Sequence, residues 1–174
     1  RGYHGGNMKQ SMIAVAVWLA VSAMAATNLT PIYDIQYSTN PGCEGTYPSP
    51  LCGQSVRTSG IVTAVNSQSG LVYMTDAQGG EWNSICFQGS DLIRQNRLRS
   101  GVRVELSGTV TEEYGMTMLV NVTDIQTSGA QTTLPEVAAT TGDVRVNEGL
   151  ESAFVCLYNV ALLDHQGGLW KLDD

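Results

Sequence analysis

The sequence predicts an all-β protein: a small five-stranded barrel followed by the first strands of a second, incomplete barrel. Its 19 glycines and frequent Thr, Ser and Val are typical of a turn-rich β protein, and 43% hydrophobic residues suffice for a core. From Gln54 onward, short runs of alternating apolar and polar residues are separated by turn residues. An internal repeat near the end of the chain indicates the second barrel.

Five strands are expected between Gly53 and Ser128. The first has Gly60 at its middle, and a glycine lets a strand bend or bulge. A polar segment, Asp91 to Leu98, is expected to form a helical turn between the third and fourth strands. The expected strands are residues 55–65, 71–75, 82–87, 102–110 and 116–125.

This order of elements is that of an OB-fold, a partly open Greek-key barrel. Its first strand must bend, because it pairs in both halves of the closed sheet. An open five-stranded sandwich is the alternative that the pattern leaves open.

The repeat appears when the sequence is shifted by 98 residues. Residues 151–155 then fall on 53–57, Val160 on Val62 and Gly168 on Gly70. We therefore expect an OB barrel over 53–128, a linker over 129–149 and a truncated second OB-like repeat over 150–174.

The N-terminal region predicts export. Residues 8–25 have a positive start, an apolar run over 13–21 and a small-residue cleavage site ending at Ala25, as a secretory signal does. The run is shorter than the ~20 residues that span a bilayer. We expect upstream read-through over 1–7, a chain starting near Ala26 that is secreted or periplasmic with no membrane attachment, and an extended lead-in with a cysteine loop over 26–52.

The four cysteines are interpreted in this exported context. Cys43 and Cys52 flank a loop rich in Gly and Pro, and we expect a disulfide between them. Cys86 and Cys156 lie inside apolar runs and are expected to be buried thiols. No C-x-x-C motif is present and the histidines, His4 and His165, are isolated, so we expect no metal and no cofactor.

Several segments together resemble a known family. They include Ile32-Tyr33-Asp34-Ile35-Gln36, Thr58-Ser59-Gly60-Ile61-Val62-Thr63-Ala64-Val65, Ser107-Gly108-Thr109-Val110 and Tyr114-Gly115-Met116-Thr117. In this order and spacing, they resemble the OB-fold module near the N-terminus of secreted bacterial nucleases and other large exported, multidomain proteins. The resemblance implies nucleic-acid binding, with a catalytic domain further along the chain. The implied partners are single-stranded DNA or RNA and downstream domains of the same chain.

OB-folds bind strands of nucleic acid on the face of their second and third strands, with aromatic side chains stacking on bases and cations along the groove. The candidate stacking residues are Tyr73, Trp82, Phe87 and Tyr114. The candidate phosphate contacts are Arg94, Arg97, Arg99 and Arg103, with Arg57 beside them. For Tyr73 and Phe87 the alternative is a place in the barrel core, and for Arg103 it is an ordinary solvated surface charge.

The charge balance argues against strong binding of nucleic acid. The chain carries 9 basic and 16 acidic residues, a formal net charge of −7, and Glu112-Glu113 fall in the expected loop between the fourth and fifth strands. Adjacent residues on a strand point to opposite faces, so these two carboxylates do not form an acid/base pair, and we expect no catalytic site here.

The alternative function is a structural, protein-binding or glycan-binding module of an exported surface protein.

Overall fold

The computed structural model describes residues 28–43, 45–95, 97–130, 133–166 and 169–173. The expected read-through, the expected signal peptide and the expected start at Ala26 lie outside these residues. Over the ranges described, no helix is both long enough and apolar enough to cross a membrane.

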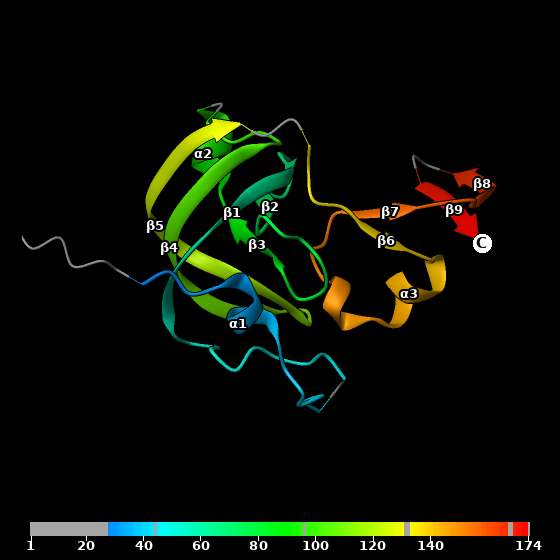
Figure 1. Ribbon diagram of the computed structural model, residues 1–174, viewed down its shortest axis with the longest axis horizontal. Helices are drawn as coiled ribbons and strands as arrows, with labels where there is room; N and C mark the ends of the chain where they lie inside the picture. Colours follow the sequence, from blue (N-terminus) through cyan, green and yellow to red (C-terminus); the bar gives the residue numbers. More distant parts are fainter. Residues whose placement is uncertain (1–27, 44, 96, 131–132, 167–168, 174) are drawn as a thin grey trace, which may run out of the picture.

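Strands are the main regular structure of the described chain, with short helices at the margins (Figure 1). The barrel strands are β1 (Ser55–Asn66), β2 (Leu71–Thr75), β3 (Ser84–Gln88), β4 (Val102–Glu113) and β5 (Met116–Ala130). The later strands are β6 (Val137–Ala139), β7 (Val155–Leu157), β8 (Ala161–Gln166) and β9 (Leu169–Asp173). The helices are α1 (Ile32–Gln36), α2 (Ser90–Arg94), α3 (Thr141–Val146) and the 3-10 turn η1 (Glu148–Leu150).

The first five strands form a closed barrel in the order β1-β2-β3-β5-β4, with β4 pairing back onto β1. Every pair is antiparallel except β3 and β5, which run parallel. The short helix α2 follows β3, at the place where the sequence predicted a helical turn. The predicted all-β OB barrel is confirmed, and closure of the sheet excludes the open sandwich.

Strand β1 exchanges partners at its midpoint. Its first half, from Ser55 to Ile61, pairs with β4, and its second half, from Ile61 to Asn66, pairs with β2. At the exchange, a Cβ atom on Gly60 would lie 2.8 Å from the carbonyl oxygen of Thr75. The glycine therefore permits a backbone approach that any side chain would block.

The barrel core is filled from all five strands and closed at one end by α1. Buried residues from the strands include Val62, Met74, Ile85, Val104 and Leu119. Ile32 and Ile35 of α1 pack against the same cluster. The lead-in expected to be extended thus contains a helix whose apolar side covers the barrel end, while α2 lies at the opposite end in Figure 1.

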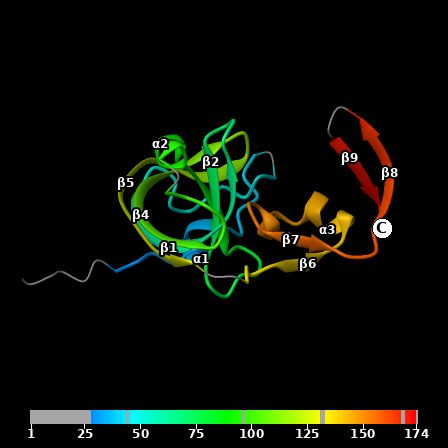
Figure 2. The ribbon, with the colours of Figure 1, turned by 90° about the horizontal axis from the view of Figure 1, so that it is seen from above.

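The chain beyond the barrel forms two small sheets. β6 and β7 pair in parallel, and β8 and β9 form an antiparallel hairpin (Figure 2). The expected linker over 129–149 contains β6 and α3, and α3 begins with a capping box between Thr140 and Asp143.

The β8–β9 hairpin has the register of the β1–β2 hairpin. Val62 pairs with Met74 and Leu162 with Leu172, offsets of 100 and 98 residues. Each hairpin then shifts register at the next position, between Val62 and Ala64 in β1 and between Leu162 and Asp164 in β8. The 98-residue shift puts Val160 in the place of Val62, whereas the hairpin puts Leu162 there, so the first strand departs from the predicted alignment by two residues.

The predicted disulfide is not formed. Cys43 and Cys52 are both free and exposed. The loop is held instead by Ser49, whose hydroxyl donates to the carbonyl oxygen of Ile35 (2.5 Å) and whose N–H donates to Glu112 (2.9 Å). These bonds fasten the loop to α1 and β4 at a point between the cysteines. Cys86 is buried as predicted, and Cys156 is half-buried.

Candidate nucleic-acid interface

Two predicted phosphate contacts, Arg97 and Arg99, lie together at the α2 end of the barrel. They line a cavity of about 260 Å³ with Val102 at the start of β4 and residues 127–129 near the end of β5. Between the two arginines, Leu98 is only 4% exposed and belongs to the core. Because Leu98 points inward, the residues on either side of it remain exposed.

Backbone hydrogen bonds fix the loop that carries these arginines. The N–H of Arg97 donates to the carbonyl oxygen of Leu92 (3.1 Å), which continues the turn of α2. The N–H of Gly101 donates to Val62 of β1 (2.8 Å). The loop is therefore hydrogen-bonded to α2 at one end and to β1 at the other. These bonds hold the backbone on both sides of Arg99 in place.

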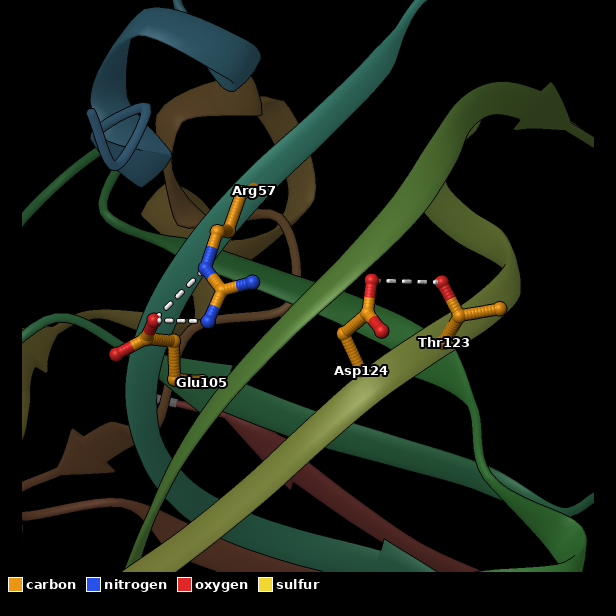
Figure 3. Close-up of polar contacts among 4 residues, drawn as sticks. All are labelled: Arg57, Glu105, Thr123 and Asp124. Atoms are coloured by element: carbon orange, nitrogen blue, oxygen red, sulfur yellow. Dashed lines mark hydrogen bonds and ion pairs between the residues drawn. The ribbon is translucent and has the colours of Figure 1, made fainter. Parts of the chain in front are cut away.

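The other arginines predicted to contact phosphate differ in whether a carboxylate already pairs with them. Arg94 pairs with Asp91 on the surface of α2. Arg103 is half-buried on β4, where it pairs in register with Ser128 beside the cavity. Arg57 forms an ion pair with Glu105 across β1 and β4 (2.7 Å), as Figure 3 shows. Arg97 and Arg99, with Arg103 nearby, therefore make up the cationic part of this surface.

A second cavity, of about 300 Å³, lies beside an earlier stretch of β5. It is lined by residues 88–92, from the end of β3 into α2, and by Val122 and Ile125. Asp91 is one of the lining residues. The α2 end thus has two neighbouring depressions, of which the one with Arg97 and Arg99 suits an anion better.

The predicted stacking residues do not gather at the α2 end. Tyr114 is fully exposed in the β4–β5 turn, where it and Gly115 have positive φ angles, as in a type I′ hairpin turn. That turn lies at the opposite end of β4 from the cavity. A strand of 12 residues is roughly 40 Å long when straight, so one short stretch of nucleic acid would not easily reach both.

Trp82 lies in an aromatic cluster. Its ring is 5.6 Å from that of Tyr37 and 6.4 Å from that of Tyr47, both edge to face. Its backbone N–H donates to the carbonyl oxygen of Gly149 (2.6 Å). Trp82 therefore packs α1, the cysteine loop and the C-terminal part of the chain against one another.

The stacking role predicted for Phe87 is wrong, and the core alternative holds. Phe87 is 0% exposed and packs inside the barrel with Val72 and Leu98. Tyr73 lies half-buried on β2, opposite Cys86 of β3. Burial raises the pKa of Tyr73, and the Cys86 thiol adds to this rise.

Sequence reasoning missed a group of carboxylates on the far side of the barrel from the arginines. Glu151 accepts hydrogen bonds from the N–H of Thr117 (3.0 Å) and from the amide of Gln36 (3.2 Å). Burial, together with the nearby Glu148 and Glu112, raises the pKa of Glu151 to about 7, although the hydrogen bonds from Gln36 and Thr117 act to lower it. Gln36 and Glu151 are 115 positions apart in the sequence, so no local pattern signals their contact. In the described part of the chain, no three His, Cys, Asp or Glu side chains could together hold a metal ion.

The sequence and the structure were compared with those of known proteins. No family model matches the sequence, and no curated protein matches it. One similar solved structure is an aspartyl-tRNA synthetase from Leishmania major Friedlin, with 14% identity and a TM-score of 0.44 over 69% of this chain and 24% of that one. Another is the OBody AM1L10 bound to hen egg-white lysozyme, with 16% identity and a TM-score of 0.38 over 47% of this chain and 84% of that one. The strand order itself defines the described barrel as one of the OB type.

Proposed function

We propose that this chain is a non-catalytic binding module whose barrel contacts the phosphates of single-stranded DNA or RNA at the α2 end. The observation that carries the proposal is the cavity lined by Arg97 and Arg99. Guanidinium groups bind phosphate with several directed hydrogen bonds, and Thr127 and Ser128 are among the residues that line the same cavity.

The rest of the barrel limits this binding to backbone contacts. Phe87 lies in the core, Trp82 in a packing cluster and Tyr114 in the distant β4–β5 turn. Tyr73 is half-buried on β2 and does not line the arginine cavity, so stacking contributes little at this end. The chain is acidic overall, with a net charge of −7. Binding should therefore be weak, independent of base sequence and strongly dependent on salt.

Replacing Arg97 and Arg99 together by alanine tests the proposal. The double variant should bind single strands of every sequence more weakly at low salt. The slope of log affinity against log salt should flatten by roughly 1.4, because each phosphate contact on a single strand contributes about 0.7. Fluorescence anisotropy with labelled homopolymers of DNA and RNA measures both quantities.

Arg145→Ala is the matched control, since Arg145 is an exposed arginine on α3, away from the cavity. The control should keep the affinity and the salt slope of the unaltered chain. If the double variant behaves like this control, the cavity is not the phosphate site. If the unaltered chain binds no single strand at low salt, the proposed function fails.

The export of this module is a second part of the proposal. We propose that it serves an exported bacterial protein, accessory to a downstream nuclease or other hydrolase. The family resemblance supports this, as does the signal-like pattern over residues 8–25. Mass spectrometry of the secreted product should find a chain that starts at or near Ala26. Product that retains residues 8–25 would contradict the export proposal while leaving the cavity untouched.

The repeated hairpin register supports a third part of the proposal, that residues 150–174 begin a second OB-like repeat. Two segments of similar composition can align with each other in sequence without sharing a structure. Here the pairing and the register shift of β1–β2 recur in β8–β9. The second strand keeps the 98-residue shift and the first departs from it by two residues, so it is the hairpin pattern rather than one constant shift that supports a duplicated unit.

A protein-binding or glycan-binding module is the alternative, and one observation favours it. The rings of Tyr33 and Tyr37 stack with centroids 5.0 Å apart and planes at 12°, and the two residues are 40% and 41% exposed. Exposed aromatic rings offer contact area to neutral ligands without needing positive charge. Binding to glycans but to no single strand would favour this alternative.

A further inference from the structure

The second cavity at the α2 end is lined by both polar and apolar residues. Its volume of about 300 Å³ lies at the lower end of the range of small-ligand sites. Three of its residues carry polar side chains, and three carry apolar ones. They are Gln88, Ser90 and Asp91, and Leu92, Val122 and Ile125.

A bulge in β5 shapes one side of this cavity. Over residues 123–126, β5 advances by three residues while its partner β4 advances by two. Asp124, inside the bulge, has a positive φ of 52°. On a regular strand, residues three apart face opposite sides, and the extra residue of a bulge corrects this. Val122 and Ile125 can therefore line the same cavity.

The polar residues of the cavity are connected to partners in a way that balances their charge. Asp91 forms an ion pair with Arg94 through its Oδ1 atom. The side-chain amide of Gln88 donates to the hydroxyl oxygen of Ser90 (2.8 Å). These contacts leave the Oδ2 atom of Asp91 as an acceptor and the hydroxyl proton of Ser90 as a donor. The cavity therefore offers hydrogen bonds without a net charge that would repel an anionic strand.

The second cavity adjoins the arginine cavity through α2 and through β5. Leu92 lines the second cavity, and its carbonyl oxygen accepts from the N–H of Arg97 (3.1 Å). On β5, Ile125 of the second cavity and Thr127 of the arginine cavity are two residues apart, about 7 Å along an extended strand. An extended single strand of nucleic acid advances by a similar distance per nucleotide. A strand whose phosphate lies at Arg97 and Arg99 thus places a neighbouring nucleotide at the second cavity.

The second cavity suits a sugar better than a base. Proteins hold the bases of single strands mainly by stacking on aromatic rings, and the residues that line this cavity are all non-aromatic. A ribose has C–H groups that contact apolar residues and hydroxyls that donate to carboxylates. Acidic side chains bind the ribose hydroxyl of dinucleotides in this way. In nucleic acids, the 2′-hydroxyl is the group that distinguishes RNA from DNA.

We propose that the second cavity binds the ribose next to the phosphate held by Arg97 and Arg99, so that the module prefers RNA to DNA of the same base sequence. The 2′-hydroxyl donates to Oδ2 of Asp91 and accepts from the hydroxyl of Ser90. This inference rests on the proposed function, because the phosphate contacts are what bring the strand to the second cavity.

Two probes that differ only in the 2′-hydroxyl test the inference. Labelled oligouridylate and oligodeoxyuridylate of equal length are titrated with the protein at one low salt concentration, and fluorescence anisotropy gives the ratio of their dissociation constants. The ribose probe should bind about 10-fold more tightly, the lower end of what a hydrogen bond to a charged group contributes. Asp91→Ala should bring this ratio close to 1. The variant also frees Arg94, which strengthens both probes alike, so the ratio is the measured quantity.

Glu113→Ala is the matched control, because it also removes one exposed carboxylate, at the end of β4 that lies away from α2. It should keep the ratio of the unaltered chain. Equal binding of the two probes, or a ratio that Asp91→Ala leaves unchanged, would overturn this inference and leave the phosphate contacts of Arg97 and Arg99 standing. If neither probe binds at low salt, the proposed function and this inference fall together.

Discussion

Replacing Phe87 by alanine should lower the free energy of unfolding by about 3–5 kcal/mol, the usual cost of removing a buried phenylalanine. Phe87 is 0% exposed and lies in the core cluster with Val72 of β2 and Leu98 of the loop after α2. Truncation removes its contacts and leaves a cavity that close-packed neighbours cannot fill. Urea or thermal unfolding followed by circular dichroism measures the loss.

Tyr114→Ala is the matched control for this prediction. It also removes an aromatic ring, but from a fully exposed position in the β4–β5 turn. Its effect on stability should stay within about 0.5 kcal/mol. A Phe87→Ala variant that kept its stability but lost affinity for a single strand would contradict the core position and restore a stacking role.

The strands were predictable because their periodicity is local. Strand β4 alternates buried and half-buried residues from Val102 to Thr109, so its sequence alone shows a half-buried strand. The role of Gly60 was also predictable, since a glycine in the middle of a long strand indicates a bend. The arginines at the α2 end were found because four of them occur within a short segment of sequence.

The predictions that failed concern contacts between distant parts of the chain. In β3, residues 84–87 are all buried. Ile85 and Phe87 belong to the core cluster, while Cys86 between them lies near Met116 and Glu151. Periodicity then no longer tells which residues fill the core, and Phe87 could be mistaken for a surface aromatic. Helix α1 is only five residues long, too short for a helical period to show. Proximity in sequence suggested pairing of Cys43 with Cys52, but the hydrogen bonds of Ser49 shape that loop.

Replacing Gly60 by alanine should destabilise the barrel by about 1–3 kcal/mol, the cost of overpacking a dense interior. The added Cβ would lie 2.8 Å from the carbonyl oxygen of Thr75, 3.2 Å from Met74 and 3.3 Å from Ile32. The nearest of these atoms belongs to the backbone of β2 and cannot move without disturbing the pairing of β1 with β2. Differential scanning calorimetry measures the expected fall in melting temperature.

Gly142→Ala provides the comparison, because the nearest atom to its new Cβ would be the hydroxyl of Thr140 at 3.5 Å, an ordinary contact. Alanine is the better helix former by up to about 1 kcal/mol, so this variant in α3 should be as stable as the unaltered chain or slightly more so. The two variants add the same methyl group, and they differ in whether the barrel backbone lies against it. If Gly60→Ala proved as harmless as Gly142→Ala, β1 could exchange partners without a close approach to β2, and the bend would need another cause.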